Sequence, residues 1–149
     1  MPWGTDERQY CSPGFDLPVI ALTRTPHGEF AEHHTSADDL SLLEPSMLAD
    51  SISALAAIVD GVDRERHLVS VVTKGEPRLG ARGLYPTLSA GVPGGAELFT
   101  QALLWLINLS DGAHSLLDVA ERSGIPLGLV HRAADTLLAN GLLHESQAR

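Results

Sequence analysis

The chain has 149 residues, of which 44% are hydrophobic and 19% charged, and this composition excludes a disordered or fibrous protein. Its 19 acidic and 10 basic residues give a net charge of −9, which disfavours broad electrostatic binding to nucleic acid. The single cysteine, Cys11, cannot form an internal disulfide, and neither a secretory leader nor a membrane-length apolar run is visible, so we expect a soluble, cytoplasmic protein.

The first part of the chain is acidic and predicts one strand and one helix. Residues 1–66 carry 12 acidic and 4 basic side chains. The apolar run at 17–22 is bounded by turn-forming residues and predicts a buried strand of a parallel sheet. We expect a polar loop over 25–39 and then a helix over 45–59, where apolar residues recur at helical spacing. Gly61 is predicted to end that helix.

The middle of the chain combines one strand with turns. Residues 67–72 are rich in β-branched side chains and predict a strand, and residues 74–77 predict a turn. Residues 78–88 contain two glycines and fit either a ribbon or an extended connection. The Gly/Pro-rich stretch 90–95 predicts a linker or a wing-type loop.

The last third predicts three helices, at 96–109, 115–122 and 126–140, with stop signals after each. Two short helices joined by a glycine-bearing turn indicate a helix-turn-helix. With a strand before this unit and residues 142–145 after it, the pattern predicts a winged helix. We expect its core to contain Leu103, Leu106, Leu116, Val119, Val130, Leu137 and Leu138.

The helix that would read DNA in such a module, 126–140, carries few positive charges. Its potential cations are His131 and Arg132, which are opposed by Asp135, and residues 98–149 contain no lysine. Non-specific affinity for DNA comes largely from basic contacts to phosphates. We therefore expect nucleic acid to be an unlikely partner, and the module either to pack internally or to bind a protein or peptide.

A histidine-rich stretch raises the possibility of a metal site. His27, His33, His34, Asp38 and Asp39 lie within thirteen residues, and imidazole and carboxylate groups are the ligands that zinc uses. Their spacing matches no closed zinc motif. A solvated loop is the alternative interpretation.

Several short motifs recur in the order found in one known family. They are residues 5–15, 24–28, 34–38, 74–77, 83–85, 108–112 and 118–124. The chain resembles the C-terminal edge of the zinc exopeptidase fold of aminopeptidases and glutaminyl cyclases. More closely, it is similar to a bacterial family of aminopeptidase-like proteins with a C-terminal winged helix, and the resemblance covers nearly the whole chain.

The resemblance implies an α+β protein with two parts. Residues 1–62 would be the C-terminal segment of an α/β zinc-exopeptidase-like domain, and residues 63–149 a winged helix-turn-helix domain. His34 would occupy the last zinc-ligand position, Asp6 would be a carboxylate lining the active site, and Asp38 would support the histidine loop. The other zinc ligands and the glutamate base would precede the first residue of this sequence. We therefore expect no peptide hydrolysis by the chain alone, and zinc binding only if a partner supplies the missing ligands.

Three functions follow. The first is a non-catalytic part of an aminopeptidase-like hydrolase, acting as half of a split enzyme or as an interaction subunit, with a truncated remnant as a variant of this idea. The second is a stand-alone winged helix that binds protein or peptide. The third is a DNA-binding regulator. A protein partner or a homo-oligomer is expected, and a membrane is not.

Overall fold

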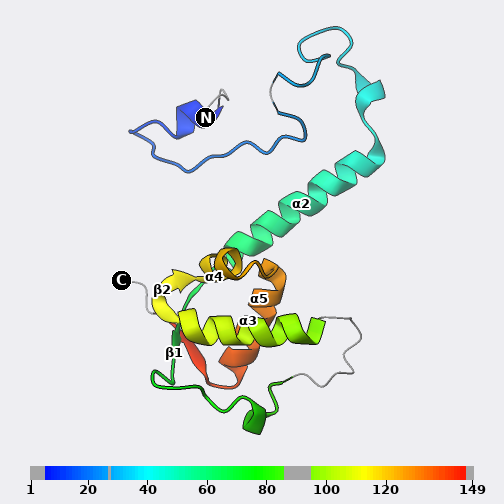
Figure 1. Cartoon of the computed structure of the whole chain (residues 1–149). Coiled ribbons are helices and arrows are strands. Elements are labelled where there is room, and N and C mark those ends of the chain that lie inside the picture. The colour runs from blue at the N-terminus through cyan, green and yellow to red at the C-terminus, as the bar shows by residue number, and fades with distance from the viewer. Residues whose placement is uncertain (1–5, 27, 86–94, 147–149) are drawn as a thin grey trace. The chain divides into compact units, whose positions relative to one another are not determined.

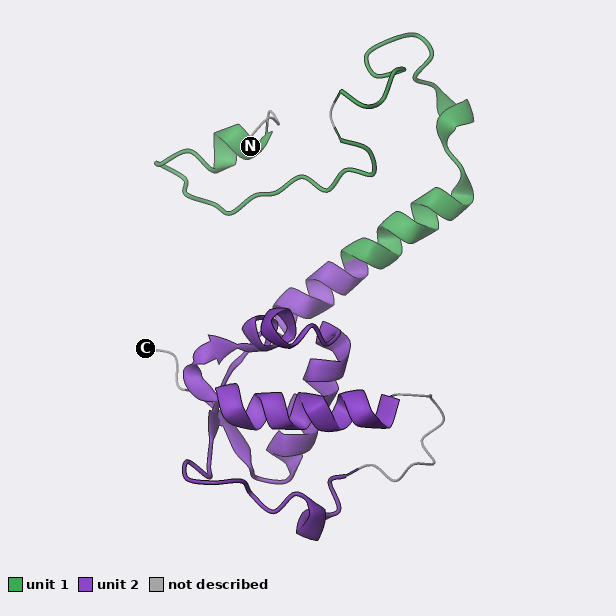
Figure 2. Ribbon diagram, viewed as in Figure 1, with its two compact units in different colours: residues 1–55 green, residues 56–149 purple. Residues whose placement is uncertain are grey.

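The computed structural model describes residues 6–26, 28–85 and 95–146 of the chain. The chain divides into two compact units, residues 1–55 and residues 56–149 (Figure 2). The division falls between Leu55 and Ala56, inside a helix. The domain boundary after residue 62, which the resemblance implies, stays a prediction.

Unit 1 contains little regular structure. Its elements are the short helix α1 (Asp6–Tyr10), the 3₁₀ helix η1 (Leu40–Leu42) and the first part of the long helix α2 (Pro45–Asp63) (Figure 1). Asp39 caps η1, because its carboxylate accepts a hydrogen bond from the Ser41 N–H at 2.8 Å. None of the described residues of unit 1 is buried, so the described part of this unit has no hydrophobic core.

The prediction of a buried strand at 17–22 is wrong. These residues form no strand, and Leu17, Ile20 and Leu22 are exposed, Ile20 to 79%. A strand needs a neighbouring strand to pair its backbone groups. The described part of unit 1 offers none, so the apolar run remains an irregular segment.

The predicted end of the helix at 45–59 is also wrong. Helix α2 continues through Gly61 and ends at Asp63. A Cβ atom at residue 61 would lie 3.3 Å from the Leu127 Cδ2 atom. The glycine therefore permits close packing against the helix that contains Leu127, rather than terminating α2.

Unit 2 contains a three-stranded antiparallel sheet. Its strands are β1 (His67–Ser70), β2 (Asp111–Ser115) and β3 (Leu143–Glu145), in the order β2-β1-β3. The register between β1 and β2 shifts between His67 and Val69. Gly112 lies opposite this irregularity with a positive φ of 83°, and a Cβ atom there would lie 3.1 Å from the Val69 Cγ2 atom. Glycine therefore satisfies both the backbone conformation and the close approach.

Three helices pack with this sheet to form the core: α3 (Gly95–Leu109), α4 (Leu116–Ser123) and α5 (Leu127–Ala139). A capping box begins α4, in which Ser115 and Asp118 satisfy each other's backbone N–H groups, and Gly124 in the left-handed conformation ends the helix. The predicted core is confirmed, with six of its residues buried and Leu138 half-buried.

Two connections differ from expectation. Strand β2 was not predicted, since the sequence indicates only a stop signal after the helix at 96–109. Residues 78–88 were expected to be a ribbon or an extended connection, but the described part contains the 3₁₀ helix η2 (Gly80–Arg82), with Leu79 fully buried beside it. The linker or wing-type loop predicted at 90–95 lies largely outside the described residues, and Gly95 already belongs to α3.

Candidate functional site

The three residues predicted near a zinc ion are all exposed in unit 1. Asp6 begins α1, while His34 and Asp38 lie in successive turns before η1. His34 has a positive φ of 62°, and its ring contacts the His33 ring at a centroid separation of 4.1 Å. Among the described residues, no hydrogen bond or ion pair joins Asp6, His34 and Asp38 to one another.

The described side chains do not form a metal site by themselves. No three or more His, Cys, Asp or Glu residues in residues 6–26, 28–85 and 95–146 come together in a way that could hold a metal ion. Catalytic zinc in proteins takes about three protein ligands and keeps an open position. A zinc site that includes His34 would therefore require ligands other than the described residues; His27 lies outside them.

The helix-turn-helix of unit 2 consists of α4 and α5, and of the two potential cations of α5 one is buried and the other is exposed. The Arg132 guanidinium lies over the Phe99 ring, 5.9 Å from its centroid. His131 is 1% exposed, and burial is the main cause that lowers its pKa from the ordinary value of 6.5. Arg132 remains exposed, so α5 presents one arginine and no lysine to a phosphate backbone.

Asp135 of α5 is the centre of an ion-pair network with the segment that follows α2. Its two carboxylate oxygens accept hydrogen bonds from Arg64 at 2.7 Å and from Arg66 at 2.8 Å. Arg66 also lies 3.5 Å from the Glu145 carboxylate in β3. We call these four residues the arginine clasp; it ties residues 64–66 to α5 and β3.

Glu65 extends the same attachment to α4. Its carboxylate accepts a hydrogen bond from the Leu117 N–H at 3.2 Å, at the first turn of that helix. A carboxylate at this position satisfies an otherwise unpaired backbone donor and is favoured by the helix dipole. Sequence analysis missed these contacts, because they join residues that are 52 to 79 positions apart.

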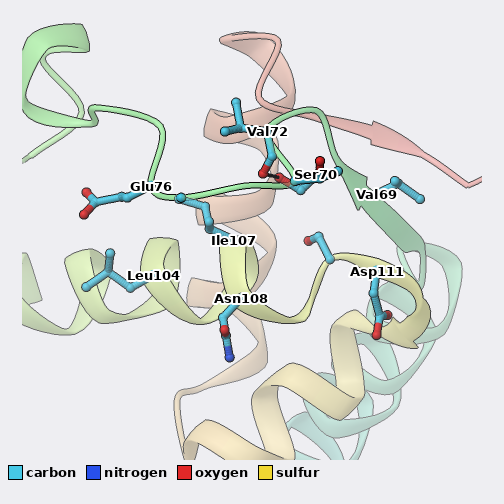
Figure 3. A pocket seen from close by; sticks show the side chains of 11 residues that line it. Val69, Ser70, Val72, Glu76, Leu104, Ile107, Asn108 and Asp111 are labelled. Carbon is cyan, nitrogen blue, oxygen red and sulfur yellow. Dashed lines mark hydrogen bonds between the residues drawn. The ribbon is translucent and has the colours of Figure 1, made fainter.

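A pocket of about 710 Å³ lies between the end of β1, the following loop and the C-terminal half of α3. In Figure 3, Leu104 and Ile107 rise from α3 toward the segment that carries Ser70 and Glu76. The Glu76 carboxylate accepts a hydrogen bond from the Tyr85 hydroxyl at 3.0 Å, which raises the pKa of Tyr85. The lining residues include Glu76 and Asp111 but no lysine or arginine, so the pocket does not suit an anion.

The Asp111 carboxylate at the edge of this pocket maintains the local turn. It accepts hydrogen bonds from the N–H groups of Ala113 and His114 and lies 3.0 Å from the His114 ring. These contacts, led by the Ala113 N–H, lower the pKa of Asp111 to about 2. Since its carboxylate oxygens already accept these hydrogen bonds, Asp111 serves to stabilise the start of β2.

Helix α2 is unusually apolar for an exposed helix. It has 19 residues, its most apolar 18-residue stretch has a mean hydropathy of 1.3, and none of its residues is buried, so by length and composition alone it could span a membrane. One such helix is weak grounds for a membrane span. In addition, Asp50 lies within the helix and Asp60 and Asp63 in its last turn, and carboxylates in membrane-spanning helices are rare and costly.

Comparison with known families divides the chain near the end of α2. Residues 66–145 match a family described as winged helix-turn-helix. Residues 1–65 match a family described as a domain of unknown function, DUF4910.

Two relatives from Clostridium acetobutylicum match both parts. One, provisionally named a polysaccharide biosynthesis protein with an aminopeptidase-like domain, is 40% identical over 143 residues, which are 96% of this chain and 32% of the relative. The other is a crystal structure of a protein provisionally described as a peptidase, with 36% identity and a TM-score of 0.82, covering 98% of this chain and 31% of that one. The chain thus spans about a third of the length of the relatives it matches, one of which is named for an aminopeptidase-like domain and the other described as a peptidase.

Proposed function

The chain belongs to the winged helix-turn-helix family, and from this premise we propose that it acts through protein contacts, as a non-catalytic part of an aminopeptidase-like hydrolase. In this role it covers and completes an aminopeptidase-like domain, which is supplied either by another polypeptide or by another part of the same one. It is then half of a divided hydrolase or its interaction subunit.

The absence of any buried residue in the described part of unit 1 carries this proposal. Many of its large apolar side chains are exposed, including Phe15, Ile20 and Leu40, which are 68%, 79% and 82% exposed. Fully burying one such side chain contributes about 1.5–3 kcal/mol. A soluble chain with this much apolar surface is expected to bury it against another protein surface.

The relatives indicate what kind of protein would provide that surface. About two thirds of each Clostridium protein has no counterpart in this chain, and one of these proteins is named for an aminopeptidase-like domain. Such a domain would carry the hydrolytic site. We propose that His34 reaches this site as one zinc ligand, with Asp38 supporting its loop and Asp6 as a nearby carboxylate, while the domain supplies the other ligands and the base.

Co-expression tests the proposal. The chain is produced alone and together with the 40%-identical Clostridium relative, from which the matching third has been deleted. The purified samples are then compared for complex formation, zinc content and aminopeptidase activity. We expect zinc and activity only in the complex, with zinc reduced by His34→Ala and unchanged by His67→Ala, a matched exposed histidine of unit 2. Failure to form any complex would refute the proposal, and a complex with unchanged zinc in His34→Ala would refute only the ligand assignment.

A second function, peptide binding by the winged helix alone, is favoured by the pocket beside α3. It has a ligand-sized volume of about 710 Å³ and a mixture of apolar and hydrogen-bonding side chains. A peptide library offered to the full chain tests this function. Peptide binding by the chain without the relative, abolished by Leu104→Asp, would support this function.

Regulation of transcription is the least supported function. Arg132 stacks on Phe99, His131 is buried and Asp135 adds negative charge, so α5 offers few phosphate contacts. Salt-sensitive binding to a defined DNA site would contradict this view.

A further inference from the structure

We propose that one face of α2 in unit 1, formed by Leu48, Ile52 and Leu55, is the docking surface for an apolar protein surface with a basic rim. This inference rests on the proposed function and identifies the contact through which the partner domain is held. We call these three residues the α2 docking face.

The spacing of the three residues places them on one side of the helix. Separations of four and three residues bring side chains to the same face of an α-helix. All three are exposed, at 52%, 67% and 49%. Surface helices usually turn such a face toward a core, but in the described part of unit 1 no residue is buried against it.

The contacts that Arg24 makes with α2 run from the edge of the docking face to the polar side of the helix. The Arg24 guanidinium donates hydrogen bonds to the Met47 carbonyl and the Ser51 hydroxyl, and it lies 3.8 Å from the Asp50 carboxylate. Asp50 is about half a turn from the docking face by helical spacing. Ser51 borders the docking face, since it lies three residues after Leu48 and four before Leu55. Arg24 therefore contacts the edge of the docking face and the polar side of α2, while the three apolar side chains of the face remain exposed.

Charge determines which kind of surface fits. Residues 1–55 contain nine acidic and two basic residues, a net charge of −7, and α2 contains three aspartates with no lysine or arginine. A second copy of this chain would bring the same negative charge, and so would an anionic membrane. An apolar protein surface rimmed by lysine or arginine complements both the apolar face and its acidic surroundings.

The length of the relatives supplies a source for this surface. About two thirds of each relative has no counterpart in the present chain. That part of the relatives could provide the surface that packs against the docking face. We therefore assign the docking face to the aminopeptidase-like domain, and not to a lipid or to a second copy.

Titration calorimetry with matched variants tests the assignment. The probe is the Clostridium relative from which the matching third has been deleted, titrated with the full chain and with Ile52→Asp or Ser53→Asp. Both variants add one carboxylate to the same exposed helix, but only Ile52 belongs to the docking face. We expect at least tenfold weaker binding for Ile52→Asp and nearly unchanged binding for Ser53→Asp.

The outcomes separate this inference from the proposed function. Equal binding of all three chains would overturn the docking face while leaving the proposed function in place. No binding by any chain would overturn both. Two other results would change the assignment. Binding to neutral phosphatidylcholine vesicles that is stronger than binding to the relative and is lost in Ile52→Asp would assign the face to a lipid. A concentration-dependent dimer with the same two properties would assign it to a second copy. Circular dichroism checks that the truncated relative is folded and that α2 is intact in each variant.

Discussion

The arginine clasp gives a quantitative prediction about how the segment after α2 is held on unit 2. Asp135→Asn keeps the size of the side chain but removes the negative charge that Arg64 and Arg66 share. The Asp135 side chain is 50% exposed and the two arginines are 33% and 25% exposed, so solvent screens the pairs in part. Partly exposed ion pairs contribute about 0.2–1 kcal/mol each. We therefore expect the substitution to lower the free energy of unfolding of unit 2 by roughly 0.5–2 kcal/mol.

Urea unfolding followed by Trp105 fluorescence, in a Trp3→Phe background, measures this change. Glu121→Gln is the matched control, because it removes an exposed carboxylate of α4 that makes no ion pair in the described structure. A double-mutant cycle with Arg66→Met isolates the pair, and 0.5 M salt should reduce the difference. Equal stability of Asp135→Asn and Glu121→Gln at low salt would refute the clasp as a stabilising contact.

Three further predictions concern unit 2. Ser115→Ala removes the side-chain acceptor of the Asp118 N–H and should cost about 1 kcal/mol in urea unfolding; a change no larger than that of Ser123→Ala would contradict the capping box. Leu106→Ala in the fully buried core should cost about 2–5 kcal/mol, against less than 1 kcal/mol for exposed Leu117→Ala, and equal losses would contradict the described core. Because burial lowers the pKa of His131 below 6.5, the unfolded chain binds the proton first, so unfolding free energy should decrease as the pH falls below about 6.5; an identical pH dependence in His131→Leu would contradict this cause.

The helices of unit 2 were predictable because their signals are local. Ser115 and Asp118 form the capping box that indicates the start of α4, Gly124 indicates its end, and Pro126 precedes α5. The apolar positions between these signals repeat at helical spacing and form the core. Each signal acts within a few residues of the chain, so no knowledge of the tertiary fold was required.

The features that sequence analysis missed depend on distant residues. Strand β2 contains no β-branched residue and exists because it pairs with β1, more than 40 positions earlier in the chain. The apolar run at 17–22 has the composition of a strand, but it lacks a strand to pair with in the described part of unit 1. The arginine clasp depends in the same way on a fold that brings residues 64–66 next to Asp135.

The candidate zinc residues are a different case, since His34, Asp6 and Asp38 were assigned through a family resemblance. Spacing alone did not distinguish a ligand from a histidine in a solvated loop. The described structure places all three on the surface of unit 1 without joining them. A role in zinc binding, as proposed, would therefore require ligands other than these three side chains.

Hydrogen exchange of the full chain, with and without the Clostridium relative lacking its matching third, tests the central claim most directly. Because no described residue of unit 1 is buried, we expect the amides of residues 40–55 to exchange rapidly in the free chain, compared with those of α3 and α5. Addition of the relative should slow exchange in residues 40–55 and leave α5 unchanged. Residues 40–55 that are already as protected as α5 in the free chain, or unaffected by the relative, would contradict the claim that unit 1 is completed by a partner domain.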